Sequence, residues 1–533
     1  MAEFKKYVKT NTTDLETALK ESLTPMEHFY DWEHDGLPFF WNSMAGGSYF
    51  GNAHHSTYSM SHIPGRWLNA MLNAEAVLGI RVNENAVEQL TKWAHASVER
   101  AGIGLPACID PDTFAVARQS DLHNLREVMH AFYALVAYRG DQHALDLAKQ
   151  VIHTVDTYFD YEKGQFDKNR YKTETGGEIV EPICENYPFP LNFGRYIGPL
   201  VKLYRACGCE EALKQAIRLK DVCFRDILKE DGYYDPKIFG YHTHSTTAMI
   251  SSLAQLGEVL NDMEILTRVK KFMENGLKEI ALDFGWCLEF AQRDDMGGEG
   301  NNTADLMETC LILGKAGFTE YFSKAEKILR GHLLPSQLLD NDFIPEGEDP
   351  ADLATYHLRK YSRGAFGFPA PWGHEYEPGH EISFNWDIVG GAAGGLCEAL
   401  RSQVNQTGRI RSIDLLFDYE DDTLRIRSPY TNDGKMHITL KDECPQLRVR
   451  IPEHVSRKEI SCEGCTAYQS GGYLYLTQIT GSRIIIDFPF ETIVQTYHFR
   501  AHTFLAAWKG ESIVAMTSSG KRLCFFPDLG ESL

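Results

Sequence analysis

The chain has 533 residues, of which 43% are hydrophobic and 24% charged, and its formal net charge is −21. This composition is typical of a folded globular protein and excludes disordered and fibrous classes. The acidic balance argues against nucleic acid or an anionic membrane surface as a partner, because proteins that bind phosphate groups normally present a basic face.

The N-terminal segment from Met1 to Lys6 leads into polar sequence and lacks the apolar core of a signal peptide. No apolar run in the sequence reaches the length that spans a bilayer. We therefore expect a cytoplasmic protein with no membrane partner, whose twelve cysteines are thiols and not a disulfide framework. The oligomeric state is left open, and a homo-oligomer is compatible with the sequence.

Apolar residues recur at helical spacing from about residue 65 to residue 405. Four stretches in this region repeat the order apolar helix, short turn, new helix, with turns at Gly140, Gly208, Asp262 and Gly317. Successive turns are 68, 54 and 55 residues apart, a spacing that accommodates two helices and their connections. Each unit is therefore predicted to be a helical hairpin.

The connections between the hairpins are long and rich in aromatic residues, Gly, Pro and His, as in residues 185–198, 231–245, 289–302 and 366–387. Loops of this kind suit convergence on a single cleft better than the uniform edge of a solenoid. We predict a mainly α protein with a β domain, in which residues 1–408 close into an (α/α)6 toroid that carries the catalytic site.

After about residue 410 the pattern changes to alternation of apolar and polar residues, as in "TLRIRSP", "KMHITL" and "SRIIIDFPF". Turn signals such as Asn432-Asp433-Gly434 and Gly471-Gly472 separate these segments. Residues 409–533 are therefore predicted to form an antiparallel β-sandwich of the kind that packs against a catalytic barrel.

Two short clusters carry groups suited to chemistry. Tyr241, His242 and His244 lie in a Gly- and Tyr-rich loop that enters a helix, where packing explains two histidines poorly, although a structural role is the alternative. Glu308 and Cys310 present a carboxylate and a thiol one residue apart, as zinc ligands do, but zinc needs about four ligands. Core packing of Cys310 is the other interpretation.

Several motifs resemble the bacterial β-L-arabinofuranosidase family, glycoside hydrolase family 127 and its relatives. In the β region the order "LRVRIP", "GGYLYL", "GSRIIIDFPF" and "AAWKGESIVAM" is similar to the sandwich of that family. In the helical region, "LREVMHAFYALVAY", "THSTTAM" and "METC" resemble three of its helices. The resemblance implies a helical toroid followed by a β-sandwich, with a carbohydrate as the substrate.

The resemblance also implies roles for single residues. His130 and His244 fall on histidines that line the sugar pocket of the family, and the third such histidine is replaced here by Arg195. Glu308 and Cys310 fall on two zinc ligands. The family then has two adjacent cysteines, one a ligand and one the nucleophile, where this chain has Asp387 and Ile388.

No Cys-Cys pair exists in this sequence, so two of the three thiolates of the family's zinc site are missing. One thiolate and one carboxylate rarely hold zinc without further ligands. We therefore predict no cofactor, and a zinc ion held in part by Glu308 and Cys310 is the alternative. The cysteine nucleophile is absent as well.

Glycoside hydrolysis in its commonest form needs two carboxyl groups, one to protonate the leaving oxygen and one to attack or to activate water. We predict Glu299 and Asp387 as this pair. The resemblance places Glu299 at the acid/base glutamate of the family and Asp387 at the vacated nucleophile position, where the field of a helix N-terminus would stabilise a carboxylate. The alternatives are that Glu299 is a solvated loop charge and that Asp387 caps its helix.

The remaining predicted substrate contacts are Arg195, which would suit a carboxylate on an acidic sugar, and Trp386, which offers an aromatic face. The favoured function is a glycoside hydrolase acting on short oligosaccharides. A uronate lyase that uses His244, Tyr241 and Arg195 is one alternative, and a catalytically inactive sugar-binding relative is another.

Overall fold

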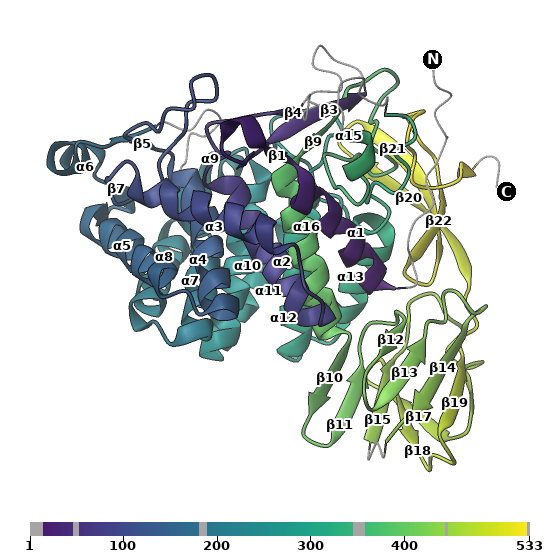
Figure 1. The fold of residues 1–533 in the computed structure, drawn as a ribbon. Helices are drawn as coiled ribbons and strands as arrows, with labels where there is room; N and C mark the ends of the chain where they lie inside the picture. The colour runs from purple at the N-terminus through teal and green to yellow at the C-terminus, as the bar shows by residue number, and fades with distance from the viewer. Residues whose placement is uncertain (1–13, 46–52, 181–188, 345–357, 443–445, 530–533) are drawn as a thin grey trace.

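The structure is a computed structural model and describes residues 14–45, 53–180, 189–344, 358–442 and 446–529. Within these residues, six inner helices form a closed ring in which each helix packs on the next and the last returns to the first (Figure 1). In ring order they are α2 (His62–Leu78), α4 (Leu125–Arg139), α7 (Ile197–Cys207), α10 (Thr243–Leu260), α12 (Gly300–Lys315) and α16 (Trp386–Ser402).

Each of the first five inner helices is followed by an outer helix that packs against it, and the outer helix α1 packs against α16. The outer helices are α1 (Leu15–His28), α3 (Glu84–Glu99), α5 (Gln142–Tyr158), α8 (Glu210–Asp226), α11 (Met263–Asn275) and α13 (Glu320–Ile328). This arrangement is the (α/α)6 toroid that the hairpin repeats predict.

Sequence pattern explains which helices lie inside. The outer helix α5 buries only one face, which carries Ala144, Leu147, Val151 and Val155, as expected of a surface helix. The inner helix α10 is instead buried from Thr243 to Gly257. Gly140 and Gly208 end α4 and α7 in the left-handed conformation, with φ of 65° and 71°, which lets the chain reverse into the outer helix.

Because an outer helix carries the chain from the end of each of the first five inner helices back toward the start of the next, all six inner helices run in the same direction and start at the same end of the ring. The loops at that end contain short elements: β1 (Tyr30–Asp31), η1 (Trp32–His34), β2 (Leu37–Pro38), β3 (Trp41–Ala45), β4 (Ala53–His54), β5 (Gln119–Ser120), η2 (Leu122–Asn124), β6 (Phe159–Asp160), β7 (Gln165–Phe166), α6 (Lys168–Thr175), β8 (Glu178–Ile179), η3 (Pro190–Gly194), α9 (Pro236–Phe239), η4 (Leu277–Glu279), η5 (Leu329–Leu333), α15 (Leu358–Tyr361) and β9 (Ile382–Asn385).

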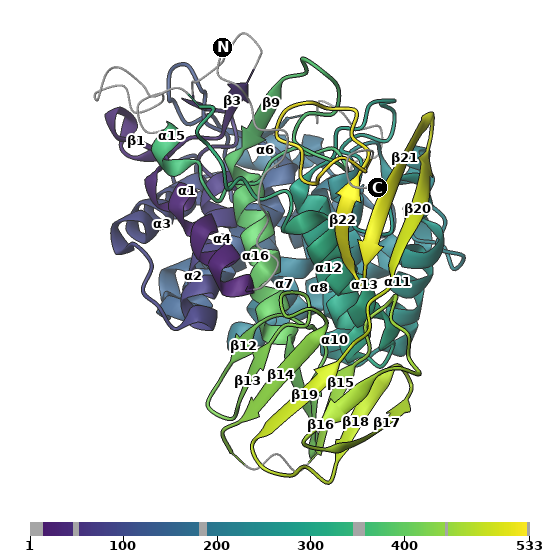
Figure 2. The same ribbon diagram turned by 90° about the vertical axis from the view of Figure 1, so that its right-hand side faces the viewer.

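A β-sandwich follows α16 and lies at the opposite end of the ring, where the inner helices end (Figures 1 and 2). One sheet has the order β10 (Val404–Thr407), β11 (Ile410–Ile413), β15 (Gln446–Arg450), β18 (Tyr473–Thr477) and β17 (Thr466–Ser470). The other has the order β12 (Tyr419–Glu420), β13 (Leu424–Arg427), β14 (Lys435–Leu440), β19 (Arg483–Asp487) and β16 (Ser461–Glu463). The pairing is antiparallel except between β11 and β15.

The domain boundaries differ from the expected division into 1–408 and 409–533. Strand β10 already pairs with β11, so the sandwich begins near Val404. The three-stranded sheet of β20 (Thr492–Phe499), β21 (His502–Lys509) and β22 (Ser512–Met516) leaves the sandwich and lies along the ring (Figure 2). Its Phe504 and Trp508 belong to the hydrophobic core of the ring, because their neighbours are aromatic residues from the helical part.

A buried charge network joins the ring to the sandwich. Glu326 of α13 accepts from Arg330 at 2.8 Å and from Arg450 of β15, and Arg450 also pairs with Glu511 at 2.5 Å. The backbone N–H of Leu416 donates to Glu326 at 2.8 Å. These groups are almost completely buried, so the network fixes the sandwich to one side of the ring.

No helix in the described part of the chain combines the length and the apolar character that crossing a bilayer requires.

Candidate active site

The candidate site lies where the six inner helices begin, and each helix supplies a side chain from its first turn or from a residue just before it. These residues are His62 of α2, Arg126 and Glu127 of α4, Arg195 before α7, His244 of α10, Glu299 before α12 and Asp387 of α16. Since the positive end of every helix dipole points to this region, carboxylates are favoured there. The ring therefore concentrates charged side chains at one end of its axis.

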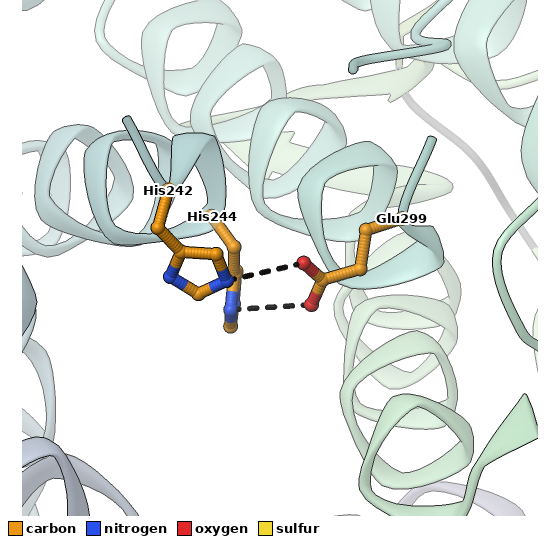
Figure 3. Close-up of side chains that lie close together, drawn as sticks. All are labelled: His242, His244 and Glu299. Atoms are coloured by element: carbon orange, nitrogen blue, oxygen red, sulfur yellow. Dashed lines mark ion pairs between the residues drawn. The ribbon is translucent and has the colours of Figure 1, made fainter. Parts of the chain in front are cut away.

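Glu299 lies against two histidines (Figure 3). Its Oε1 is 3.3 Å from Nδ1 of His244, and its Oε2 is 3.6 Å from Nε2 of His242. Glu299 is the N-cap residue of α12, but its side chain makes no capping hydrogen bond. It is 5% exposed, so the alternative that Glu299 is a solvated loop charge is wrong.

Asp387 is held by His62 and Asn301. Its Oδ2 lies 3.3 Å from Nε2 of His62 and accepts from Nδ2 of Asn301 at 3.4 Å. Burial would raise the pKa of Asp387, but the hydrogen bond and charge of His62, together with Arg66, lower it below its usual value. Asp387 is therefore ionised at neutral pH.

The other oxygen of Asp387, Oδ1, is buried and has no hydrogen-bond partner among the described residues. The N-cap of α16 is Asn385, and the helix has no side-chain capping bond, so the structure gives no support to the alternative that Asp387 is a cap. A buried carboxylate oxygen without a partner is costly in a folded protein. Oδ1 is thus the atom of this site that is available to a ligand.

Asn301 joins the two predicted catalytic carboxylates. Its Nδ2 donates to Oε1 of Glu299 at 2.8 Å and to Oδ2 of Asp387 at 3.4 Å, so these two oxygens lie no more than 6.2 Å apart. Its Oδ1 accepts from Arg66 at 3.4 Å. The prediction that Glu299 and Asp387 come together from distant loops agrees with this geometry.

Beneath the pair, Glu127 is surrounded by three guanidinium groups. Arg66 Nε lies 2.7 Å from its Oε2, Arg126 Nη1 lies 3.1 Å from its Oε1, and Arg195 Nη2 also pairs with Oε1. Burial would raise the pKa of Glu127, but the three positive charges hold it well below its usual range. This cluster fixes four inner-helix starts relative to each other, because Arg126 also contacts Asp305 of α12 at 3.4 Å.

Two further carboxyl groups have raised pKa values. Burial raises the pKa of Asp305 to about 6, although Arg126 and Arg66 oppose the shift. Burial and the charge of Glu299 raise the pKa of Glu289 to about 7. Carboxyl groups with pKa values near neutrality are typical of functional sites, so both groups are candidates for holding a proton here.

Four histidine rings form a continuous chain along this region. His62 stacks on His123 with ring centres 5.1 Å apart, His123 lies 5.9 Å from His242, and His242 lies 5.8 Å from His244. Burial and the neighbouring Arg195 lower the pKa of both His123 and His244 well below the usual value. These two rings are therefore neutral at physiological pH and act as hydrogen-bonding groups.

The structure gives no support to two predicted substrate contacts, Arg195 and Trp386. Arg195 is completely buried, and its guanidinium group is engaged by Glu127 and faces His123, so it is not presented to a ligand carboxylate. Trp386 is also completely buried, and one face of its indole stacks on Phe29 with ring centres 4.2 Å apart. Trp386 is therefore a core residue and offers no platform for a sugar.

His130 and Tyr241 lie beside the site. His130 is one turn beyond Arg126 and Glu127 on α4 and lines a cavity of about 30 Å³ on the ring axis with Asp305 and Glu308. Its Nδ1 has no partner among the described residues. Tyr241 is partly buried, and its carbonyl oxygen accepts from Ala291 at 2.8 Å, which fixes the loop that carries His242.

The structure does not bring Glu308 and Cys310 together. Residues two apart on a helix point to opposite sides, and here Glu308 faces the axis, where it accepts from Ser251 at 2.7 Å and lies 3.8 Å from Lys202. Cys310 is 1% exposed in the core, and burial raises the pKa of its thiol to about 12. The donors present do not fit a family-type thiolate zinc site.

A different set of donors is suited to a metal. Among the described residues, His242, His244 and Glu299 each offer one ligand atom, and these atoms lie within 4.8 Å of one another. This cluster includes both residues of the His-x-His motif.

Sequence reasoning missed six residues: His62, Arg66, Arg126, Glu127, Asn301 and Asp305. A signal for three of them was available: Arg66, Arg126 and Glu127 are charges in the first turns of nearly apolar helices, where charged residues are expensive unless paired. Asn301 is the second residue of α12, which begins just after Glu299, and Asp305 lies about one turn further along the helix.

The glycines after Asp387 have a steric reason. A Cβ on Gly391 would overlap with Oδ1 of Asn301 and approach Nη1 of Arg66 to 2.8 Å. A Cβ on Gly390 would lie 2.9 Å from the backbone of Arg66. The Gly-rich start of α16 therefore permits the close approach of α2 and α12 on which the contact between Asn301 and Asp387 depends.

No protein-family model matches the chain, and a search of curated proteins gives no match. Solved structures do match. A GH127 β-arabinofuranosidase superposes with a TM-score of 0.58 at 12% sequence identity, over 95% of this chain and 84% of that one. A GH127 β-L-arabinofuranosidase from Geobacillus stearothermophilus T6 gives 0.52 at 14% identity, over 93% and 80% of the two chains.

A sugar epimerase from a ruminal bacterium superposes with a TM-score of 0.51 at 16% identity, over 74% of this chain and all of that one. At such low identities these similarities establish the fold alone. They confirm the remote resemblance to GH127 β-arabinofuranosidases, a helical toroid followed by a β domain.

Proposed function

We propose that this protein is a carbohydrate-active enzyme that hydrolyses glycosidic bonds of short oligosaccharides with Glu299 and Asp387. The observation that carries the proposal is that one amide, Nδ2 of Asn301, bonds to both carboxylates and so holds them within 6.2 Å of each other, at distances of 2.8 and 3.4 Å. A buried pair of carboxyl groups at this separation is what glycoside hydrolysis requires.

The environments of the two groups assign their roles. Asp387 is ionised because its pKa is lowered, and its Oδ1 has no partner among the described residues, so it serves as the nucleophile. Glu299 contacts two imidazoles and an amide, and it serves as the proton donor to the leaving oxygen. The separation falls short of the roughly 6.5 to 9.5 Å that leaves room for a water between the groups, which favours retention of configuration.

The reaction then has two steps. Oδ1 of Asp387 forms a bond to the anomeric carbon while the bond to the leaving oxygen breaks and that oxygen takes the proton of Glu299. Water then attacks the glycosyl ester, Glu299 takes its proton, and Asp387 leaves as the carboxylate. His62 stabilises the Asp387 carboxylate before the first step and again when it leaves in the second step.

The fold supports a carbohydrate as the substrate, because the superposable structures include two described as β-arabinofuranosidases and one described as a sugar epimerase. The hypothesis of an acidic sugar as substrate depended mainly on Arg195, which is buried against Glu127. The same observation weakens the lyase alternative, which relied on that guanidinium group to neutralise a uronate.

A second candidate is proton transfer at a sugar carbon, as in epimerisation. The chain of four histidine rings from His62 to His244 favours it, because imidazoles are the commonest acid–base groups of enzymes. Epimerisation converts one reducing sugar to another without releasing a monosaccharide. Product analysis therefore separates the two candidates directly.

The test is incubation of the purified protein with a panel of di- and trisaccharides and nitrophenyl glycosides, including L-arabinofuranosides. Hydrolysis should release a monosaccharide, and Asp387→Asn and Glu299→Gln should each lower kcat by about 10²- to 10⁴-fold. Glu16→Gln is the matched control, because Glu16 pairs with Lys20 at the surface of the outer helix α1. Equal turnover by wild type and both amide variants contradicts the proposal, and binding without turnover supports the inactive relative.

A further inference from the structure

We infer that His242, His244 and Glu299 form a binding site for a divalent transition-metal ion. The residues come from two segments, the start of α10 and the residue before α12, and their ligand atoms converge (Figure 3). Imidazole and carboxylate donors are the set that zinc and its neighbours in the first transition series prefer. This site shares no residue with the Glu308–Cys310 pair.

The distances fit an ion between the donors. Donor atoms about 2.1 Å from a tetrahedral metal lie about 3.4 Å from each other. Nδ1 of His244 lies 3.3 Å from Oε1 of Glu299, and Nε2 of His242 lies 3.6 Å from Oε2. These two contacts join different oxygens of Glu299, and one ligand atom from each residue lies within 4.8 Å of the others, so an ion bound by all three would draw the donors closer together.

The far side of each imidazole is held by a second partner. Nδ1 of His242 lies 2.9 Å from Oγ of Ser245, and Nε2 of His244 lies 3.3 Å from Oδ2 of Asp305. A histidine ligand normally donates its other N–H to such an acceptor, because this fixes the tautomer whose lone pair faces the metal. Asp305 thus directs Nδ1 of His244 toward Glu299.

Arg66 is a competing partner of His244, because Nη2 of Arg66 lies 3.3 Å from the same Nε2 of His244. If that nitrogen accepted from Arg66, Nδ1 of His244 would carry the proton and donate to Glu299, and no metal would bind. Metal binding therefore reports which tautomer His244 adopts.

The charge of Glu299 favours a cation. Among the described residues, no Lys or Arg lies within ion-pair distance of its carboxylate, and both of its ion-pair contacts are histidines. A buried carboxylate without a cationic partner is unstable unless it is protonated or metal-bound. A divalent ion would neutralise it and would also offset the negative charge of Asp305 and Glu289 nearby.

The consequence for activity rests on the proposed function. A Glu299 that ligates a metal cannot carry the proton that the leaving oxygen needs, so the metal-loaded protein should not hydrolyse glycosides. We infer that the ion acts as an inhibitor and that a chelator restores activity.

The test titrates chelator-treated full-length protein with Zn²⁺ by calorimetry and with Co²⁺ by absorbance. We expect one tight ion per chain, with Co²⁺ bands of nitrogen and oxygen ligands and without a thiolate charge-transfer band. Glu299→Gln and His242→Ala should each abolish this binding, and Ser245→Ala should weaken it by about 10- to 100-fold. His143→Ala, which removes a half-exposed histidine paired with Glu99 elsewhere, is the matched control.

Circular dichroism and thermal melting without metal show whether the variants fold. If His242→Ala does not fold, the isosteric Glu299→Gln still tests the metal site. The inference is overturned if the wild type and Glu299→Gln bind Zn²⁺ equally well. A thiolate charge-transfer band in the Co²⁺ spectrum also overturns it. Tight binding by a protein without glycosidase activity upholds the metal site and contradicts the proposed function. Zn²⁺ that binds and stimulates hydrolysis upholds the site and overturns the inhibitory role together with the acid role of Glu299.

Discussion

Nε2 of His62 lies 3.3 Å from Oδ2 of Asp387, so the first and the last inner helices of the ring meet at the candidate site. This contact lowers the pKa of Asp387 against the effect of burial. A carboxyl group with a lowered pKa is ionised above that pKa and loses its charge as the pH falls through that pKa.

His62→Gln should therefore raise the pKa of Asp387 and move the acidic limb of kcat/KM to higher pH. The pH profile of hydrolysis measures this shift. His143→Gln, at a distant half-exposed site, should leave the limb unchanged. An unchanged limb in His62→Gln would show that Asp387 is not the group that titrates.

Two glycines of α16 give a matched steric test. Gly391→Ala would push its Cβ into Oδ1 of Asn301, whereas a Cβ on Gly394 would meet only Nδ2 of Asn69, at 3.3 Å. Gly391→Ala should displace Asn301 and lower kcat by about 10²-fold, since misplacing a catalytic group by about 1 Å has that effect. Gly394→Ala should keep nearly full activity. Steady-state kinetics and melting of both variants provide the comparison.

Glu127→Gln should destabilise the ring by about 3–5 kcal/mol, because it leaves the guanidinium groups of Arg66, Arg126 and Arg195 buried without their shared anion. Urea unfolding measures the change. Glu420→Gln, which removes an exposed partner of Arg425 and Lys441, should have little effect. Similar midpoints for the two variants would show that the buried cluster is not held by Glu127.

Arg450→Met should weaken the attachment of the sandwich to the ring. Arg450 joins Glu326 of α13 to Glu511, and its loss removes the cationic partner of buried Glu511 and leaves buried Glu326 with Arg330 alone. Calorimetry should then show separate unfolding transitions for the ring and the sandwich where the wild type shows coupled ones. Arg427→Met, at an exposed pair with Asp418 in the same sandwich, is the control and should not separate them.

Much of the fold can be predicted from the sequence because it depends on local sequence patterns. Gly140 and Gly208 mark turns that only a left-handed residue completes, and the helical and alternating periods fix the ring and the sandwich. The return of β20–β22 to the ring is not visible in this way, because a strand's alternation does not state which core its apolar face joins. The expectation that all of residues 409–533 form the sandwich therefore missed the separate sheet of β20–β22.

The candidate site was predicted in part. Glu299, His242, His244 and Asp387 are brought together, and they are the residues whose sequence setting packing explains least. Arg195 and Trp386 were assigned to the substrate because both residue types also suit ligands. Their burial depends on Glu127 and Phe29, which lie 68 and 357 residues away in the sequence, and no local pattern reveals such partners.

Closure of the ring by its last helix sets the order in which a nascent chain acquires the site. His62 and Glu127 are synthesised early, but Asp387 arrives only with α16, which must insert between α2 and α12 and under α1. Contacts over such separations form slowly, because a long loop must close before they contribute. We therefore expect the two carboxylates to meet only after α16 has closed the ring between α2 and α12.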